Sequence, residues 1–402
     1  MTDSTALLEA VNLAVGYGDK VVVSDFNLSI QRGEVVCLLG PNGSGKSTIL
    51  KTLAKLQPAV SGEIFLQGKR LQDYRNAELA KIVSLVLTER QRLPYMRVRE
   101  LLAIARSPYT DFLGRLRAED KEAIERAMVE VGIAEFSERF LDELSDGEKQ
   151  KVFIAKALVQ EPKLIILDEP TSHLDIRHMV EVIRILRKIA QTRQISCLMS
   201  LHELDLALKS SQYVLFLHEA KVAARGLPED LLQEDLIQEF YELEGATYNQ
   251  QLGILELEGP QRNDIFVWAG GNYGIELYRA LSRQAYGLSS GILSPYDICY
   301  PVALGICHKI VERNPQEPSS AAGLQESLHL AKEAGVVVDS GYPGSLSAQF
   351  LEAVINEGIT LFSLRSPKEI ESIVSRDLYN DALNKQKLFF SASVSELLRF
   401  LM

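Results

Sequence analysis

Short apolar runs alternate with helical stretches along most of the chain. The runs have the length and composition of buried β-strands. They occur at residues 34–39, 83–87, 164–167, 195–199 and 213–217. Because strands that alternate with helices of this length form βαβ units, the pattern predicts a parallel sheet covered on both faces.

Two segments depart from this alternation. Further short strands are predicted near the N-terminus, at residues 7–14, 21–23 and 26–30. The segment 97–150 is instead helical, and it contains a helix that opens with acidic residues. One face of that helix carries Ile124, Ala127, Met128 and Val131. We expect this segment to be a helical insert that interrupts the sheet.

A second α/β pattern begins near residue 263. It follows a short, mostly polar, Pro-containing segment at 259–264 that has the composition of a linker. Strands are predicted at 265–269, 336–338 and 360–364, helices at 275–284 and 346–355, and a glycine-rich turn at 270–274. We therefore expect two domains, residues 1–258 and residues 263–402.

The composition is that of a globular protein and limits the choice of partner. The 402 residues are 46% apolar and 24% charged, and 54 acidic against 43 basic side chains leave a net charge of −11. An acidic surface argues against nucleic acid or anionic lipid as the partner. The four cysteines are too scattered for a disulfide framework or a metal site. With no signal peptide and no apolar stretch of about 20 residues, the chain is expected to be soluble by itself.

Residues 40–48, GPNGSGKST, match the phosphate-loop pattern G-x-x-x-x-G-K-[ST] between a buried strand and a helix expected to about residue 55. Gly43 and Gly45 allow the backbone N–H groups to turn toward phosphate oxygens. Lys46 is expected to reach the β- and γ-phosphates and Ser47 to offer its hydroxyl to Mg²⁺. The other residues of this loop that are predicted to bind the nucleotide are Gly40, Asn42, Ser44 and Thr48.

An acidic strand end complements the phosphate loop. The apolar run 164–167 leads directly into Asp168 and Glu169. Asp168 would hold Mg²⁺ at the edge of the sheet, and Glu169 would polarise a water for in-line attack on the γ-phosphate. An apolar run that ends in two acidic residues is common and unspecific by itself. Its spacing from the phosphate loop makes the assignment of Asp168 and Glu169 to the nucleotide site more specific.

Between these motifs stands LSDGEKQ at 144–150, and here the sequence resembles the ATP-binding cassette (ABC) family, whose signature is L-S-G-G-Q. Ser145 and Gly147 are retained, whereas Asp146 and Glu148 depart from the consensus. In the family the two retained residues bind the γ-phosphate of the opposite subunit. The alternative is an ordinary helix N-cap, and one geometry can serve both purposes.

The resemblance extends to other positions in the expected order. It implies that Asp175 in PTSHLD lies in the D-loop, that His202 in SLHE senses the γ-phosphate, and that Tyr17 stacks on adenine. Thr88 stands where the family has a glutamine that touches Mg²⁺, and its oxygen, with Glu89 beside it, can substitute as a ligand. The remaining histidines are expected to be solvated or structural, namely His173, His178, His218, His308 and His329.

The stretches at 87–90, 106–110 and 114–116 are similar to cassettes of iron-siderophore, haem and cobalamin importers. The resemblance covers about residues 5–245. It implies an α/β fold: a P-loop ABC cassette with a parallel core sheet, an antiparallel β subdomain and a helical insert, followed by a smaller Rossmann-like α/β domain.

The same resemblance implies a function. The chain would be an ATPase that uses ATP and Mg²⁺ to energise an ABC importer, with Glu169, His202 and Lys46 as its catalytic residues. It would act as a homodimer bound to transmembrane permease subunits, on the cytoplasmic face of the inner (plasma) membrane. A periplasmic or surface substrate-binding protein would take part indirectly, and no nucleic acid is expected.

Two alternatives remain open. A soluble ABC ATPase that acts on DNA or ribosomes is disfavoured by the single cassette and the acidic surface. The second domain could be an enzyme, but no nucleophile–base pair or metal-ligand spacing supports that. Its turn at 270–274 could receive a phosphate or simply be a tight turn, and Asp297 and Asp339 lie where doubly wound sheets place ligand groups. By analogy with other extended cassettes, we expect a regulatory ligand sensor.

Overall fold

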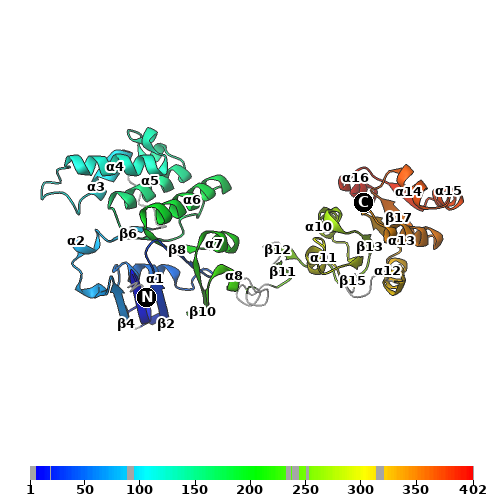
Figure 1. Ribbon diagram of the computed structural model, residues 1–402, viewed down its shortest axis with the longest axis horizontal. Helices are drawn as coiled ribbons and strands as arrows, with labels where there is room; N and C mark the ends of the chain where they lie inside the picture. The colour runs from blue at the N-terminus through cyan, green and yellow to red at the C-terminus, as the bar shows by residue number, and fades with distance from the viewer. Residues whose placement is uncertain are drawn as a thin grey trace. The chain divides into compact units, whose positions relative to one another are not determined.

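The computed structural model describes residues 6–18, 20–87, 95–231, 237, 244–249, 253–313 and 321–401. Its contacts divide the chain into two compact units, Met1–Leu236 and Ile237–Met402 (Figure 1). The boundary between the units, at residues 236 and 237, therefore comes earlier in the chain than the boundary at 258–263 expected from the sequence. A hairpin of β11 (Ala246–Asn249) and β12 (Ile254–Leu257) packs against α11 (Tyr300–Ile306), which belongs to the second unit.

The first unit is built on a mainly parallel sheet with the strand order β10-β9-β3-β8-β7-β6. All neighbours in it are parallel except β10, which pairs antiparallel with β9. The strands are β3 (Val35–Leu39), β6 (Val83–Val86), β7 (Leu164–Leu167), β8 (Ser196–Leu201), β9 (Tyr213–His218) and β10 (Lys221–Gly226). The apolar runs recognised in the sequence are therefore confirmed as the buried strands of this sheet.

An antiparallel sheet with the order β2-β1-β4-β5 packs beside it. Its strands are β1 (Leu8–Tyr17), β2 (Lys20–Ile30), β4 (Ser61–Leu66) and β5 (Lys69–Arg70). The short strands expected at 21–23 and 26–30 are one strand, β2. A bulge joins them, because Leu13 pairs with Phe26 and Val15 with Val23, and Asp25 has a φ of 54°.

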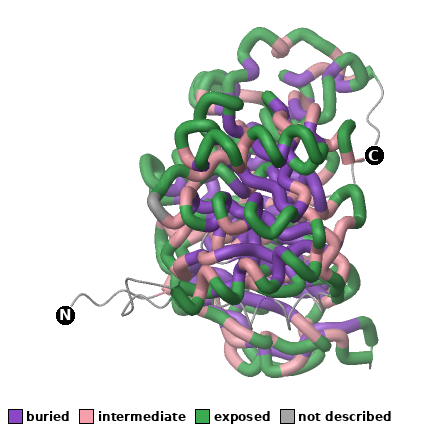
Figure 2. Tube along the Cα trace, turned by 90° about the vertical axis from the view of Figure 1, so that its right-hand side faces the viewer, coloured by how far each residue is buried: buried purple, intermediate pink, exposed green. Residues whose placement is uncertain are grey.

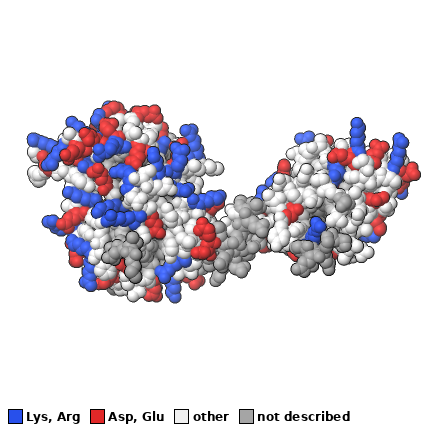
Figure 3. Space-filling model, viewed as in Figure 1, with Lys and Arg blue, Asp and Glu red and all other residues white. Residues whose placement is uncertain are grey.

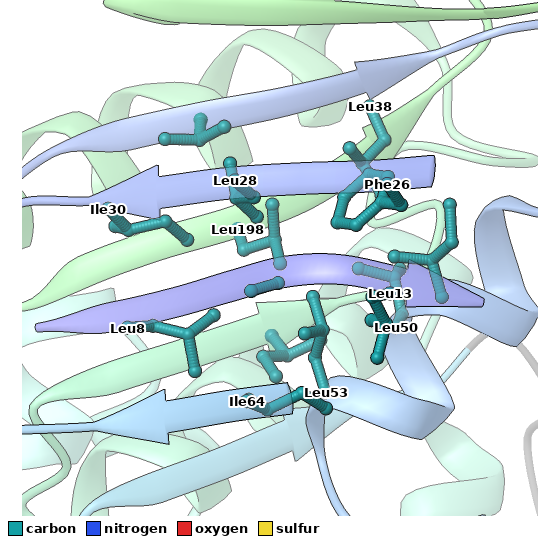
Figure 4. Close-up of a cluster of buried hydrophobic side chains, with 14 of the residues drawn as sticks. Leu8, Leu13, Phe26, Leu28, Ile30, Leu38, Leu50, Leu53, Ile64 and Leu198 are labelled. Atoms are coloured by element: carbon teal, nitrogen blue, oxygen red, sulfur yellow. The ribbon is translucent and has the colours of Figure 1, made fainter. Parts of the chain in front are cut away.

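The core of this unit lies between the two sheets. Leu8 and Phe26 of the antiparallel sheet belong to the same buried cluster as Leu38 and Leu198 of the parallel sheet (Figure 4). Leu50 of α1 (Lys46–Leu53) packs in this cluster as well. Burial of each such side chain contributes about 1.5–3 kcal/mol. Figure 2 shows the same general pattern for the chain, with buried residues in the interior of the trace and exposed ones at its periphery. This packing holds the end of β3 and the start of α1 in place.

Helices cover the parallel sheet and form the predicted insert. The insert comprises α3 (Val98–Ala105), α4 (Ala118–Val131) and the first part of α5 (Asp146–Val159), which contact one another (Figure 1). The apolar face expected on α4 is buried. The other helices are α2 (Asn76–Leu79), α6 (Ile176–Arg193), α7 (Leu204–Ser210) and α8 (Pro228–Leu231), with 3₁₀ turns at Leu71–Asp73, Ala134–Phe136 and Leu141–Glu143.

The second unit is a parallel sheet with the order β15-β14-β13-β16-β17-β18. Numbered along the chain this is 3-2-1-4-5-6, the doubly wound order. Its strands are β13 (Ile265–Trp268), β14 (Leu288–Leu293), β15 (Lys309–Glu312), β16 (Val336–Asp339), β17 (Thr360–Ser363) and β18 (Leu388–Phe390). Its helices, besides α11 and a 3₁₀ turn at Gly271–Tyr273, are α10 (Ile275–Arg283), α12 (Ala321–Ala334), α13 (Ser345–Asn356), α14 (Pro367–Ile373), α15 (Arg376–Asn384) and α16 (Val394–Leu401).

Within the described ranges, no helix is both long enough and apolar enough to span a bilayer.

A buried arginine ties the insert together. The Arg106 guanidinium donates to Asp120 Oδ1 at 2.8 Å, to the Val159 carbonyl at 2.8 Å and to Glu161 Oε2 at 2.9 Å. Arg106 and Asp120 are both buried. Asp120 belongs to α4, and Val159 and Glu161 lie at the end of α5. The Arg106 side chain, which follows α3, therefore links all three helices.

We predict that Arg106→Ala destabilises the protein by about 3 kcal/mol, because it leaves the buried Asp120 carboxylate without its partner. Urea unfolding followed by circular dichroism measures the change. Arg75→Ala is the control, since its ion pair with Glu78 is exposed, and it should leave the midpoint nearly unchanged. Equal effects of the two substitutions would contradict a structural role of Arg106.

Candidate phosphate-binding site

The phosphate loop joins the end of β3 to the start of α1. Gly43 and Gly45 have φ values of 82° and 96°, in the left-handed region that glycine adopts without strain. A Cβ on Gly45 would also lie 2.4 Å from Cγ2 of Val23. Because α1 begins at Lys46, the N–H groups of its first turn face the loop, where an anion is favoured.

Lys46 is buried within this loop. Its Nζ donates to the carbonyls of Gly40 at 2.7 Å and Pro41 at 2.9 Å. Burial lowers the pKa of Lys46, and the nearby carboxylates of Glu169 and Asp168 oppose that shift. The Ser44 hydroxyl is also buried and has no hydrogen-bond partner within the described chain. The loop thus offers a cation and an uncommitted hydroxyl where a phosphate would lie.

Asp168 is the point at which the phosphate loop meets the acidic strand end. The hydroxyls of Ser47 and Ser200 both donate to its Oδ1, at 3.1 Å and 2.8 Å. Ser47 comes from α1, and Ser200 comes from β8, the strand next to β7. The oxygens of Ser47 and Asp168 are the kind of ligand that Mg²⁺ prefers, and they already lie together.

Glu169 and His202 form a close pair beside this cluster. Glu169 Oε1 lies 2.5 Å from His202 Nε2, and the Ser172 hydroxyl donates to Oε2 at 2.8 Å. Burial alone would raise the pKa of Glu169, but the hydrogen bonds from His202 and Ser172 and the charge of Lys46 hold this pKa below its usual value. Glu169 is therefore an ionised carboxylate at neutral pH, as a base toward water must be.

Tyr17 ends β1 near the first turn of α1. Its side chain is largely exposed, and its hydroxyl lies 3.4 Å from Thr48 Oγ1. An aromatic ring with an open face beside the phosphate loop is available to stack on a planar base. Asn42, at the tip of the loop, is also exposed.

Ser145, Gly147 and Asp175 form a second cluster. Ser145 is the N-cap of α5, and Asp175 is the N-cap of α6. His178 connects Asp175 to Gly147: its Nδ1 lies 2.9 Å from Asp175 Oδ1, and its ring would be 2.2 Å from a Cβ on Gly147. The cap predicted as the alternative for Ser145 therefore exists, and glycine at 147 is needed for the close approach of His178.

The structure places the phosphate loop, Asp168, Glu169, His202 and Tyr17 in one region. Thr88 and Glu89 lie outside the described residues. Two contributors were missed in the sequence, Ser172 and Ser200. Ser200 stands two residues before His202 in the same motif, but only the pairing of β7 with β8 shows that it reaches Asp168.

The fold and the site define the class of protein. A glycine loop between a buried strand and a helix, an acidic strand end bonded to the loop serine, and a carboxylate–histidine pair are the parts of a P-loop nucleotide-hydrolysing domain. Sequence comparison gives the particular family. The sequence model described as ABC transporter matches residues 23–172, and one described as the MJ0874 family matches residues 288–398.

The uncharacterized ABC transporter ATP-binding protein MJ0873 of Methanocaldococcus jannaschii is 41% identical over 290 residues, which are 72% of this chain and 100% of the relative. The chain therefore belongs to the ATP-binding proteins of ABC transporters, and it is an ATPase of that family that binds ATP. This confirms the resemblance seen in the sequence.

Other relatives match a shorter part of the chain. The iron(3+)-hydroxamate import ATP-binding protein FhuC of Bacillus subtilis is 35% identical over 59% of this chain and 88% of FhuC. The ferric enterobactin transport ATP-binding protein FepC of Escherichia coli is 34% identical over 60% of this chain and 90% of FepC.

Solved structures agree on the fold. MJ1267, an ATP-binding cassette of an ABC transporter, superposes with a TM-score of 0.54 at 23% identity, over 60% of this chain and all of MJ1267. CbiO1 of Clostridium perfringens, part of the ABC transporter complex cbiONQ, gives 0.52 at 26% identity, over 58% of this chain and 93% of cbiO1. The predicted ABC cassette, with its antiparallel subdomain, helical insert and additional C-terminal α/β sheet, is confirmed.

We predict that Ser200→Ala lowers kcat for ATP hydrolysis about tenfold, because hydrogen bonds to charged groups contribute about 1.5–3 kcal/mol and Asp168 loses one of them. Steady-state phosphate release measures the change. Ser210→Ala is the control, since Ser210 is also buried but, within the described part of the chain, its hydroxyl bonds to Ala207 and Ser211 and not to an acidic residue. A Ser200→Ala enzyme with unaltered kcat would show that this hydroxyl does not support the site.

Proposed function

We propose that this chain is the ATP-hydrolysing subunit of an importer whose cargo is an iron-siderophore, haem or cobalamin. The observation that carries the hydrolytic part is the Glu169–His202 pair, whose 2.5 Å contact lies beside the Ser47–Asp168 bond. The names of FhuC and FepC, which are import and transport proteins for ferric siderophores, support the cargo class.

Each group of the site has a role in this proposal. The phosphate loop and Lys46 bind the β- and γ-phosphates of ATP, and the Tyr17 ring stacks on adenine. Ser47 and Asp168, with Thr88 as a further candidate, would hold Mg²⁺, which supplies charge neutralisation at the phosphates. Glu169 accepts a proton from the attacking water, and His202 orients that carboxylate toward the γ-phosphate. Catalysis then consists mainly of positioning and electrostatic stabilisation.

The second cluster completes the site in a dimer. In the proposed homodimer, Ser145 and Gly147 of one copy contact the γ-phosphate held by the other, and Asp175 lies between the two sites. Closure over ATP and reopening after hydrolysis is a two-state change that a bound permease can follow. The proposed position is peripheral, on the cytoplasmic face of the membrane, with a substrate-binding protein acting on the other side.

Two surface properties support a permease rather than a nucleic acid as the partner. On the face of the first unit seen in Figure 3, Lys and Arg are interspersed with Asp and Glu, and do not form a basic track. The helical insert exposes large apolar side chains, which are suited to contact with another protein. They include Ile104, Phe112 and Leu113.

We predict that Glu169→Gln keeps ATP affinity but loses hydrolysis, since the amide cannot accept the proton from water, and that it accumulates as an ATP-bound dimer. Lys46→Ala should instead lose ATP binding. Binding of a fluorescent ATP analogue, phosphate release and gel filtration measure the three properties. Cells that carry either variant should lose ferric-siderophore uptake, and uptake at the native rate would contradict the proposal. A ribosome- or DNA-directed ATPase would leave uptake unaffected.

We further propose that the second unit is a ligand-sensing regulatory domain. Its support lies at the carboxyl ends of its strands, near the point between β13 and β16 where the strand order reverses. There the Ser340 hydroxyl is buried without a hydrogen-bond partner among the described residues, and the same holds for the Ser391 hydroxyl at the carboxyl end of the edge strand β18. The buried Asp339–Arg365 ion pair, 2.8 Å between Oδ2 and Nε, lies at the same edge.

The glycine turn at 270–274 has a structural explanation of its own. Asp297 accepts hydrogen bonds from the Gly271 N–H at 2.9 Å and from the Cys299 N–H at 2.8 Å. A Cβ on Gly270 would lie 2.8 Å from the Tyr342 ring. Asp297 therefore holds the turn, and Gly270 allows Tyr342 to pack on it. The proposed ligand site rests on the uncommitted serines and not on this turn.

Trp268 is the only tryptophan in the sequence, and it ends β13 with its Nε1 donating to Ser347 Oγ at 2.9 Å. We predict that ATP, AMP or cobinamide changes the fluorescence lifetime of Trp268 in the full-length Lys46→Ala protein, in which the cassette does not bind ATP. Ser340→Val should abolish the change. Lifetimes that none of the three probes alters would contradict a ligand site for nucleotides or corrinoids at this edge.

A further inference from the structure

The hydroxyl of Ser145, the serine of the signature, already donates a hydrogen bond within its own chain. The Ser145 hydroxyl donates to Glu148 Oε2 at 2.8 Å, and the Ser145 N–H donates to the same oxygen at 2.7 Å. In return the Glu148 N–H donates to Ser145 Oγ at 3.3 Å. These bonds form a capping box at the start of α5. A serine hydroxyl has one proton, so it cannot donate to Glu148 and to another acceptor at the same time.

Glu148 carries a negative charge in this box. The Ser145 N–H, then the Ser145 hydroxyl, and then the charges of Arg139 and Lys151 lower the pKa of Glu148 below its usual value. Asp146 adds a second acidic side chain to the same turn of α5. The N-terminus of α5, where a helix favours an anion, therefore already has acidic side chains of its own.

We propose that the charge of Glu148, held against the Ser145 hydroxyl, repels the γ-phosphate that Ser145 meets and so weakens closure of the dimer over ATP. This inference rests on the proposed function, because it requires that Ser145 meets the γ-phosphate of the opposite copy. Glutamine, the family consensus here, accepts the same two hydrogen bonds without a charge. The carboxylate adds repulsion toward the incoming phosphate, which has the same sign.

Arg139 moderates this repulsion. Its Nη1 lies 3.9 Å from Glu148 Oε1, and its Nη2 donates to the Glu143 carbonyl at 2.9 Å. Its guanidinium also lies 5.3 Å from the centre of the Phe136 ring. Arg139 is thus held beside the carboxylate by contacts that do not depend on Glu148. The balance between the two charges sets how much ATP is needed to close the dimer, and a closed dimer is needed for hydrolysis.

A capping role alone makes a different prediction from electrostatic competition. A cap changes the stability of α5, and glutamine preserves it, so Glu148→Gln would then leave dimer closure unchanged. Competition between charges depends instead on ionic strength, because salt shortens the range of repulsion from about 10 Å at 0.1 M to about 3 Å at 1 M. The salt dependence of closure is therefore the discriminating measurement.

The experiment uses the full-length protein in the Glu169→Gln background, in which hydrolysis is stalled, and measures the ATP-driven dimer by analytical ultracentrifugation. At low salt, Glu148→Gln should lower the dimer dissociation constant roughly tenfold, and the difference should shrink toward 1 M salt. Arg139→Gln should raise this constant when Glu148 is present and have little effect together with Glu148→Gln. Such a double-mutant cycle isolates the coupling between the two side chains.

Asp142→Asn is the matched control. It removes one exposed acidic charge from the turn Leu141–Glu143, just ahead of Ser145, and should leave the dissociation constant unchanged. Thermal unfolding of the Glu148→Gln protein checks that the cap is kept. Equal dissociation constants with and without the Glu148→Gln substitution, at every salt concentration, would overturn this inference alone. If no variant dimerises with ATP, the proposed function fails as well.

Discussion

The hydrogen bonds that Asp168 accepts hold the candidate site together. Ser47 brings the phosphate loop to this carboxylate, and Ser200 brings the strand that leads to His202. Ser200 also accepts the Glu169 N–H at 2.8 Å, so one serine positions both acidic residues. Because β3, β8 and β7 are parallel neighbours, their carboxyl ends meet at one edge, and the register of the sheet determines the geometry of the site.

The two helix N-termini in the proposed chemistry differ in charge. The first turn of α1 carries no acidic side chain, and its loop contains Lys46, so it is prepared for an anion. The first turn of α5 carries Asp146 and Glu148, whose negative charges already lie at the positive end of the helix, and the capping box already bonds the N–H groups of Ser145 and Glu148. In the proposed dimer, α5 would therefore limit the strength of the site, whereas the start of α1 is the end prepared for the phosphates.

Much of the fold could be predicted because buried parallel strands are continuous apolar runs. The run 164–167 became β7 with the same limits, and its position before Asp168 was sufficient to place the acidic pair. Strand β14 gave no such signal, since Ser289 and Ser290 lie inside it. Both serines are fully buried, and their hydroxyls bond to Asn263 and Tyr278, partners that only the folded chain brings near.

The sequence by itself determined the strand–helix order, the phosphate loop and the identity of the groups around it, because these depend on local spacing and on residue type. The tertiary structure alone decided that Ser200 supports Asp168, that His178 packs on Gly147, and that the hairpin 246–257 joins the second unit. Each of these is a contact between segments distant in the chain. Such contacts follow from strand pairing and close packing, which the periodicity of a single segment does not contain.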